Sequence, residues 1–471
     1  MEKETNGTTA QLDVNLDLDL NTLMNKYGIQ NYDSKVINKI LHYTNRFQNQ
    51  NKTESPVSQN GESEDKNDIY GDFRFLMVMG RIIGLIPFSG VLSKSSRNVT
   101  FRRRSIPSLV SHMILLVVIF NAGLGILYTM KTPRKDASEV VMSFRHVLCH
   151  LWGCFIYILF LFRGNEFLKI FETWRSTQTC YSKKDTKLWR DVIIIGTLLM
   201  SSIVLENGVL HLKYFRELDN FTETTTVYNH SATFTSFESF YWRSNPHWAS
   251  ALGYHWFVAV IAFLQHKWML YAWNYIDILL AIVGRALYFQ FKALCEIAEK
   301  KVKEEKDVFD LVDTQASQNA WNQIVRDHKN LCRILQVVEN FFSPIVFGSY
   351  TLNIYYLCLQ LSDCLTIGVL HKGIVYSIYF PWSFLHLIAR CFVVSIYCAK
   401  INFYVHQIRN LLQDCPPEYY EPEVSRLDKR LTFGPDIGLS GLGCFVVTKP
   451  FILQVFSVLF TFEIILLQIV S

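Results

Sequence analysis

Long apolar segments alternate with polar, charged segments along most of this 471-residue chain. An apolar helix of about 20 residues crosses the roughly 30 Å hydrocarbon core of a bilayer. Another apolar run, 268–283, follows the fourth such segment too closely for the chain to turn round, and it is interpreted as the same helix continuing beyond the membrane. The pattern predicts an all-α protein with seven transmembrane helices, at 107–130, 140–162, 192–212, 247–265, 340–361, 374–400 and 451–470.

Lys and Arg residues gather on alternate connections between these segments. Roughly 27 of them lie before span one and after spans two, four and six, against roughly 7 on the other connections. The positive-inside rule makes the basic connections cytoplasmic, so we expect the N-terminus inside and the C-terminus outside. Rhodopsin-like receptors have the opposite orientation, and their Asp/Glu-Arg-Tyr and Asn-Pro-x-x-Tyr motifs are missing here. The largest outer loop carries glycosylation sequons at Asn220 and Asn229.

The remaining segments divide the chain into regions. Residues 1–69 are polar and lack an apolar signal sequence, which predicts a disordered cytoplasmic tail. Residues 70–106 mix apolar and basic residues, as expected of a juxtamembrane segment along the inner face. Residues 107–400 hold spans one to six, with helical extensions of spans four to six into the cytoplasm. Residues 401–449 form a cytoplasmic anchor segment, and 450–471 form the last helix.

The last span carries one polar face. Ser457, Thr461, Gln468 and Ser471 follow each other at spacings of 4, 7 and 3, which places all four on one side of a helix. The rest of the helix is Phe, Ile, Leu and Val, with Glu463 as the exception. A polar seam on an apolar membrane helix indicates a surface facing water or other subunits. Hydroxyls and amides that join neighbouring helices are the alternative.

Polar and aromatic side chains also gather in the outer halves of the spans, where they predict a pocket for a small polar ligand. Aromatic rings stack on C–H surfaces, while carboxylates and amides bind hydroxyls. The alternative is an interfacial aromatic belt with polar groups bonded between helices. Asp277 and Arg285 are expected to be paired within the helical bundle. Arg390 is expected either to form a structural ion pair or to extend its charge to the inner membrane interface, and not to contact the ligand. The candidate ligand-binding residues are Glu206, Trp248, His255, Tyr356, Gln360, Asp363, Tyr379 and Trp382.

Composition removes several classes of protein. Half of the residues are hydrophobic and only 18% are charged, below the quarter or so that is typical of soluble domains. The eleven cysteines form no Cys-x-x-Cys pair and no Cys/His cluster with metal-ligand spacing. Phosphate loops, nucleophile elbows and zinc-protease motifs are missing too, so we expect no enzyme, cofactor or metal site. The net charge of +5 comes from the inner connections, without the basic–aromatic pattern of a nucleic-acid binder.

The end of the chain resembles the signature that closes insect gustatory receptors: Thr-Tyr, five mostly apolar residues, then Gln-Phe. Here it is Thr461-Phe462, five residues, and Gln468-Ile469, so two aromatic positions differ. Glu463, the acidic residue that follows Phe462, resembles the sugar-receptor branch of that family, whose members tend to have Thr-Tyr-Glu at this place. Four further segments resemble the same branch in the same order, and the resemblance runs from about residue 103 to the end. They are 273–277, 353–360, 387–390 and 439–449.

This resemblance implies a ligand-gated, non-selective cation channel in the plasma membrane of chemosensory neurons. It implies a homotetramer, with co-assembly with related receptors left open, in which each subunit binds a sugar in its outer pocket and contacts membrane lipid. The last helix would line the path of the permeating cations. A sugar transporter and a metabotropic seven-helix receptor remain as alternatives. The implied pore and gate residues are Ser457, Thr461, Ile464, Leu467 and Gln468.

Overall fold

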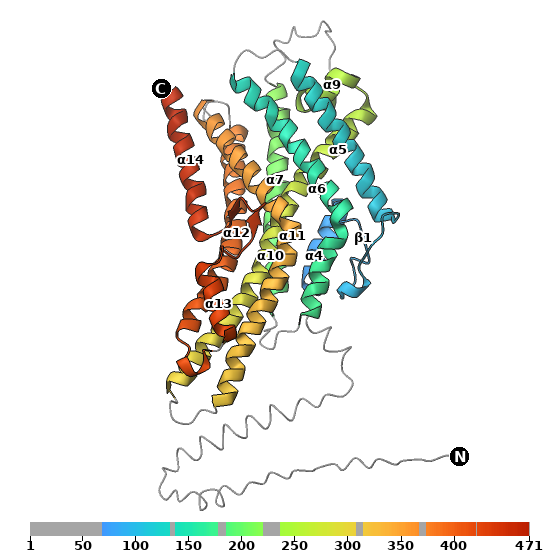
Figure 1. The fold of residues 1–471 in the computed structure, drawn as a ribbon. Helices are drawn as coiled ribbons and strands as arrows, with labels where there is room; N and C mark the ends of the chain where they lie inside the picture. Colours follow the sequence, from blue (N-terminus) through green and yellow to red (C-terminus); the bar gives the residue numbers. More distant parts are fainter. Residues whose placement is uncertain are drawn as a thin grey trace, which may run out of the picture. The chain divides into compact units, whose positions relative to one another are not determined.

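The computed structural model describes residues 68–131, 137–177, 185–219, 236–307, 314–366, 374–420 and 422–470 (Figure 1). Most of these residues are helical. The helices are α4 (Tyr70–Ile82), α5 (Ile106–Lys131), α6 (Ala137–Ser176), α7 (Leu188–Asp219), α8 (Ser236–Ser244), α9 (Pro246–Leu252), α10 (Trp256–Asp307), α11 (Thr314–Thr366), α12 (Ile374–Gln413), α13 (Pro422–Phe433) and α14 (Lys449–Val470). Residues 1–67 of the predicted disordered tail and the sequons at Asn220 and Asn229 lie outside the described residues.

Short elements connect these helices. Two 3-10 turns, η1 (Ser96–Asn98) and η3 (Pro417–Tyr419), lie outside the long helices. Two antiparallel hairpins pair β1 (Phe88–Ser89) with β2 (Thr100–Phe101), and β3 (Ser440–Gly441) with β4 (Phe445–Val446).

The prediction of seven membrane-crossing helices is confirmed. Among the described residues, α5, α6, α7, α10, α11 and α12 contain segments long and apolar enough to cross a bilayer. The seventh, α14, has 22 residues and is apolar over Lys449–Phe462. At 1.5 Å per residue it is about 33 Å long, which matches the hydrocarbon core.

The fourth span begins later than predicted. Residue 247 was expected to start it, but 246–252 form the separate helix α9, which ends at Gly253. Gly253 has φ +67°, a conformation that favours glycine, and its N–H donates to the carbonyl of Ala249 at 3.0 Å. The long helix α10 then starts at Trp256, and the N–H of Ala259 donates to the carbonyl of His255 at 2.9 Å. The predicted fourth span was therefore wrong at its start, because apolar content cannot reveal a local break.

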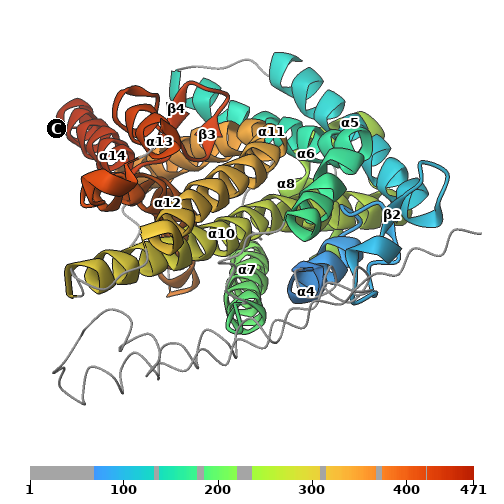
Figure 2. The same cartoon turned by 60° about the horizontal axis from the view of Figure 1, so that its bottom comes forward.

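The continuation of the fourth span past the membrane is confirmed. Helix α10 has 52 residues, about 78 Å, more than twice the thickness of a hydrocarbon core. It packs against α11 and α12 on one side and against α7 on another (Figure 2). Tyr275, Ile276 and Leu279 on this helix are completely buried. Residues on α10 therefore meet side chains from most of the other spans.

The hairpin β3–β4 fixes the start of α14. Leu442 and Gly443 both have positive φ, 51° and 72°, in the loop between the paired residues Gly441 and Phe445. The N–H of Leu442 donates to Ser343 Oγ of α11 at 2.8 Å. The ring of Phe445 stacks on Phe451 of α14 with centroids 4.5 Å apart. The first turn of α14 is thus held against α11.

The orientation in the membrane leads to a first prediction. An epitope tag placed after Ser471 should be stained on intact cells, because an odd number of crossings puts the C-terminus opposite the basic inner connections. Replacing Asn220 and Asn229 by Gln should remove a glycosidase-sensitive shift in gel mobility. Staining that requires permeabilised cells would reverse the orientation.

Candidate functional site

A chain of hydrogen bonds joins three spans in their outer halves. Ser383 Oγ on α12 donates to the carboxylate of Glu206 on α7 at 2.6 Å. Gln360 Nε2 on α11 donates to Ser383 Oγ at 2.9 Å. The other end of this amide, Gln360 Oε1, is buried and has no hydrogen-bond partner among the described residues. A buried acceptor without a partner costs free energy, which a ligand hydroxyl would recover.

An indole lies next to this chain on α12. Trp382 is 37% exposed, and its Nε1 donates to the carbonyl of Ser202 on α7 at 3.4 Å. One turn later on α12, the imidazole of His386 bonds to Ser202 Oγ at 2.9 Å and to Asn274 Oδ1 at 3.2 Å. A partly exposed aromatic ring is therefore carried by the residue next to Ser383, which joins the carboxylate to the amide. Stacking and hydrogen bonding of a small polar ligand require such a combination.

A buried ion pair closes the inner end of this region. Arg390 Nε on α12 lies 2.9 Å from Asp277 Oδ2 on α10, and both side chains are almost completely buried. The same guanidinium donates to Asn353 Oδ1 at 2.7 Å and also to Asn274. Its carbon atom lies 4.8 Å from the ring centroid of Trp273. Of the two expectations for Arg390, the structural ion pair is confirmed.

Asp277 has a further partner besides Arg390, and Arg285 belongs to a separate set of ion pairs. Ser349 Oγ of α11 donates to Asp277 at 2.5 Å. Arg285 forms ion pairs at 2.8 Å with Asp185 and with Asp191, near the other end of the bundle. These pairs confirm the expected structural role of both residues.

Tyr356 lies one turn from Gln360 on the same face of α11. Its hydroxyl donates to the carbonyl of Arg145 on α6 at 2.6 Å. Its ring centroid is 4.8 Å from that of Trp273. Tyr356 therefore packs on the ring that also contacts Arg390, and its hydroxyl already has a hydrogen-bond partner.

Other candidate ligand residues lie elsewhere. Trp248 is buried between α9 and α5, where its Nε1 donates to Asn121 and its ring packs edge-on against Phe120. His255 is exposed in the break before α10. Tyr379 packs edge-on against Phe380 near the start of α12. The side chain of Asp363 lies outside the described part of the chain. The structure thus joins Glu206 and Gln360 through Ser383, with Trp382 next to Ser383 in the sequence and Tyr356 one turn from Gln360 on α11.

Ser383, which links Glu206 to Gln360, was not predicted from the sequence. A signal was available, because Ser383, His386 and Arg390 follow at spacings of 3 and 4 on one face of α12. A lone serine in an apolar run otherwise looks like a packing residue. Ser202 and Asn274 were missed for the same reason, since their importance depends on partners from other helices.

The polar seam of α14 faces away from the rest of the chain. Ser457, Thr461, Ile464 and Gln468 are all exposed. Thr461 Oγ1 donates to the carbonyl of Ser457 at 2.8 Å. Gln454, which the sequence analysis did not include, is exposed on the same side one turn earlier. The side chains of Leu467 and Glu463 are not among those that the structure describes.

Two other kinds of site can be considered. Within the described ranges, no group of three or more His, Cys, Asp and Glu side chains is arranged to hold a metal ion. An apolar cavity lies between α11, α12 and α14, but of the proposed ligand residues none lines it. The hydrogen-bonded region at Glu206, Gln360 and Trp382 is therefore the candidate site for a polar ligand.

Comparison with known proteins gives a consistent set of relatives. The sequence profile of a family described as trehalose receptor matches residues 48–471. Three curated relatives come from Drosophila melanogaster. Gustatory receptor for sugar taste 64f is 20% identical over 90% of this chain and 87% of its own length. Gustatory receptor for sugar taste 64b is 24% identical over 84% of this chain and 93% of its own length. Gustatory receptor 5a for trehalose is 21% identical over 83% of each chain.

Solved structures show the same fold. The insect olfactory receptor OR5 from Machilis hrabei superimposes with a TM-score of 0.60 at 14% sequence identity, covering 85% of this chain and 100% of the receptor chain. The structure of that receptor in complex with eugenol gives a TM-score of 0.58 at 13% identity, with the same coverage.

Proposed function

This chain belongs to the trehalose-receptor family of insect gustatory receptors, and from that membership we propose that it is a sugar-gated, non-selective cation channel. It is a multi-pass membrane protein, and the proposal places it in the plasma membrane of chemosensory neurons. Relatives named for sugar taste and for trehalose support a carbohydrate ligand. The fold that this chain shares with an insect olfactory receptor supports the arrangement of its membrane helices.

The observation that carries the sugar site is the unpartnered, buried Gln360 Oε1 next to the Ser383–Glu206 hydrogen bond. Two sugar hydroxyls can donate here, one to this oxygen and one to the second oxygen of the carboxylate. The partly exposed ring of Trp382 offers an apolar face for the C–H surface of the sugar. A carbohydrate supplies many hydroxyl donors and C–H faces in one small molecule, so it fits this set of groups better than an apolar ligand does.

The pore is proposed to form where the α14 helices of four subunits meet. Each subunit presents Ser457, Thr461 and Gln468 on the exposed side of this helix. Four such seams around an axis would give cations a polar path, and Ile464 and Leu467 would narrow it when the channel is shut. Sugar opens the channel if the open arrangement binds it more tightly than the shut one.

The pocket is tested by dose–response measurements in a heterologous cell. Glu206→Gln and Gln360→Ala should each raise the sugar concentration for half-activation about ten- to hundredfold, because one charge-assisted or buried hydrogen bond is worth about 1.5–3 kcal/mol. The maximal current should survive. Trp382→Ala should act in the same direction through the loss of stacking.

Glu296→Gln is the matched control, because Glu296 is exposed on α10 in a pair with Lys292 far along the helix. It should leave the curve in place. If Glu206→Gln, Gln360→Ala and Trp382→Ala combined leave the sugar response unchanged at normal surface expression, the sugar binds elsewhere.

A further inference from the structure

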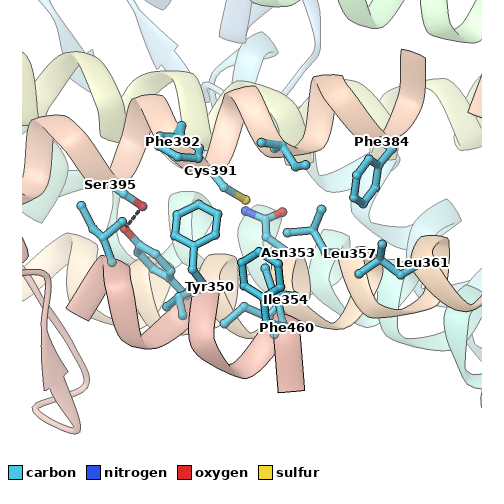
Figure 3. A pocket seen from close by; sticks show the side chains of 15 residues that line it. Tyr350, Asn353, Ile354, Leu357, Leu361, Phe384, Cys391, Phe392, Ser395 and Phe460 are labelled. Carbon is cyan, nitrogen blue, oxygen red and sulfur yellow. Dashed lines mark hydrogen bonds between the residues drawn. The ribbon is translucent and has the colours of Figure 1, made fainter. Parts of the chain in front are cut away.

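Behind the exposed seam of α14, a cavity of about 290 Å³ lies between this helix, α11 and α12 (Figure 3). Leu357 and Leu361 line it from α11, Phe384 and Ile388 from α12, and Val455 and Leu459 from α14. The cavity does not overlap the candidate sugar site, because neither Glu206, Gln360 nor Trp382 borders it. It is therefore a second space in the fold.

The walls of this cavity are almost entirely hydrocarbon, and its few polar groups already have partners. The hydroxyls of Tyr350 and Ser395 bond to each other at 2.8 Å, as Figure 3 shows. The amide of Asn353 donates to Asp277 at 3.2 Å and accepts from Arg390 at 2.7 Å. Water needs two to four polar partners to occupy a cavity, and these walls do not supply them. An occupant must be apolar.

The surroundings of the cavity indicate where such an occupant comes from. Its border includes Phe460 on α14 and Phe392 on α12, which are 64% and 38% exposed. Both residues lie within helices that cross the membrane, so the medium at this border is the hydrocarbon of the bilayer. A void beside lipid tails loses dispersion contacts on every wall, and a tail that enters restores them.

We propose that the hydrocarbon tail of a bilayer lipid occupies this cavity and packs between the pore helix α14 and helices α11 and α12. The tail touches Val455 and Leu459 on one side and Asn353 on the other. Asn353 also holds Arg390 at the inner end of the sugar region. The bound tail therefore lies between the residues that hold this region and the helix proposed to line the pore.

Photo-labelling of the full-length protein tests this occupant without any sugar. The purified protein is placed in vesicles containing phosphatidylcholine with a diazirine near the end of one acyl chain, irradiated, digested and mapped by mass spectrometry. We expect adducts on cavity residues of α12 and α14, including Cys391 and Leu459. Phosphatidylcholine with the diazirine in its headgroup should not label them.

Two variants make the test specific. Ile388→Phe fills the space from α12 and should remove most of the cavity adducts. Leu385→Phe is its control, because Leu385 lies one turn earlier on the same helix, is 63% exposed and does not line the cavity. It should leave the adducts in place. If Ile388→Phe does not fold, Leu459→Phe fills the same space from α14 and the remaining adducts are read on α12.

Three results would overturn the proposal. The first is the absence of adducts on the cavity residues of the wild type, which is expected if a second copy of the chain covers the opening. The second is that the cavity-filling variants keep the wild-type adducts, which would mean non-specific contact with the bilayer. Labelling only by a free fatty acid with the same diazirine would assign the cavity to another ligand. None of these results bears on sugar binding, so each is distinct from a failure of the proposed function.

Discussion

Arg390→Ala should remove most of the folded receptor from the cell surface, and with it the response to sugar. The change leaves Asp277, which is 0% exposed, as a buried charge without its cation. Removing one partner of a buried ion pair costs about 3–5 kcal/mol, a large part of the stability of a typical protein. Asn274, Asn353 and the ring of Trp273 lose their contacts to the guanidinium as well. Surface biotinylation and thermal unfolding of the purified protein measure the loss.

The double variant Arg390→Met with Asp277→Leu is the informative comparison. It removes both charges and keeps the volume, so it should be more stable than either single variant, since buried pairs can be replaced by apolar residues at little cost. Lys292→Ala, which opens an exposed pair with Glu296, should change stability by less than about 1 kcal/mol. Normal expression of Arg390→Ala, or a double variant as unstable as the sum of the singles, would contradict the assigned role.

Cysteine at Gln468 should let a small charged thiol reagent block nearly all of the current. Gln468 is exposed on the seam that also carries Thr461 and Ser457, near the outer end of α14. A reagent added from outside should react faster when sugar is present, because opening exposes the seam to water. Gln468→Ala should change the basal leak or the open-channel current and leave the half-activating sugar concentration close to that of the wild type.

Leu459→Cys provides the control on the same helix. Leu459 packs on the opposite side of α14, against the cavity formed with α11 and α12. A charged reagent should not reach it, so the current should persist. Block through Leu459→Cys without block through Gln468→Cys would show that the pore face of α14 was assigned to the wrong side.

The fold could be predicted from the sequence because membrane helices are recognisable by their length and apolar content. Helix α5 is an uninterrupted apolar segment, and its expected and observed limits differ by one residue at each end. The break at Gly253 was missed because one residue with positive φ interrupts an apolar stretch without changing its composition. The hydropathy of a segment does not indicate its local backbone conformation.

The candidate site could be predicted only in part. Glu206, Gln360 and Trp382 stood out because a carboxylate, an amide and an indole are conspicuous in outer membrane segments. Ser383 did not stand out, although it joins two of them, because its role arises from helices far apart in the sequence. Trp248 fitted the sequence pattern equally well, yet it packs between α9 and α5. Residue type indicates what a side chain can bind, and only the packing of α7, α11 and α12 decides which side chains meet.

The central claim is that this chain alone forms a cation channel opened by sugar. The most direct measurement is current across a planar bilayer that contains only the purified protein, recorded while mono- and disaccharides are added one at a time. We expect unitary cation currents that appear with at least one sugar, and Glu206→Gln should shift them to higher sugar concentration. Saturable sugar uptake into vesicles without current, or a response that appears only when a trimeric G protein is supplied, would contradict it.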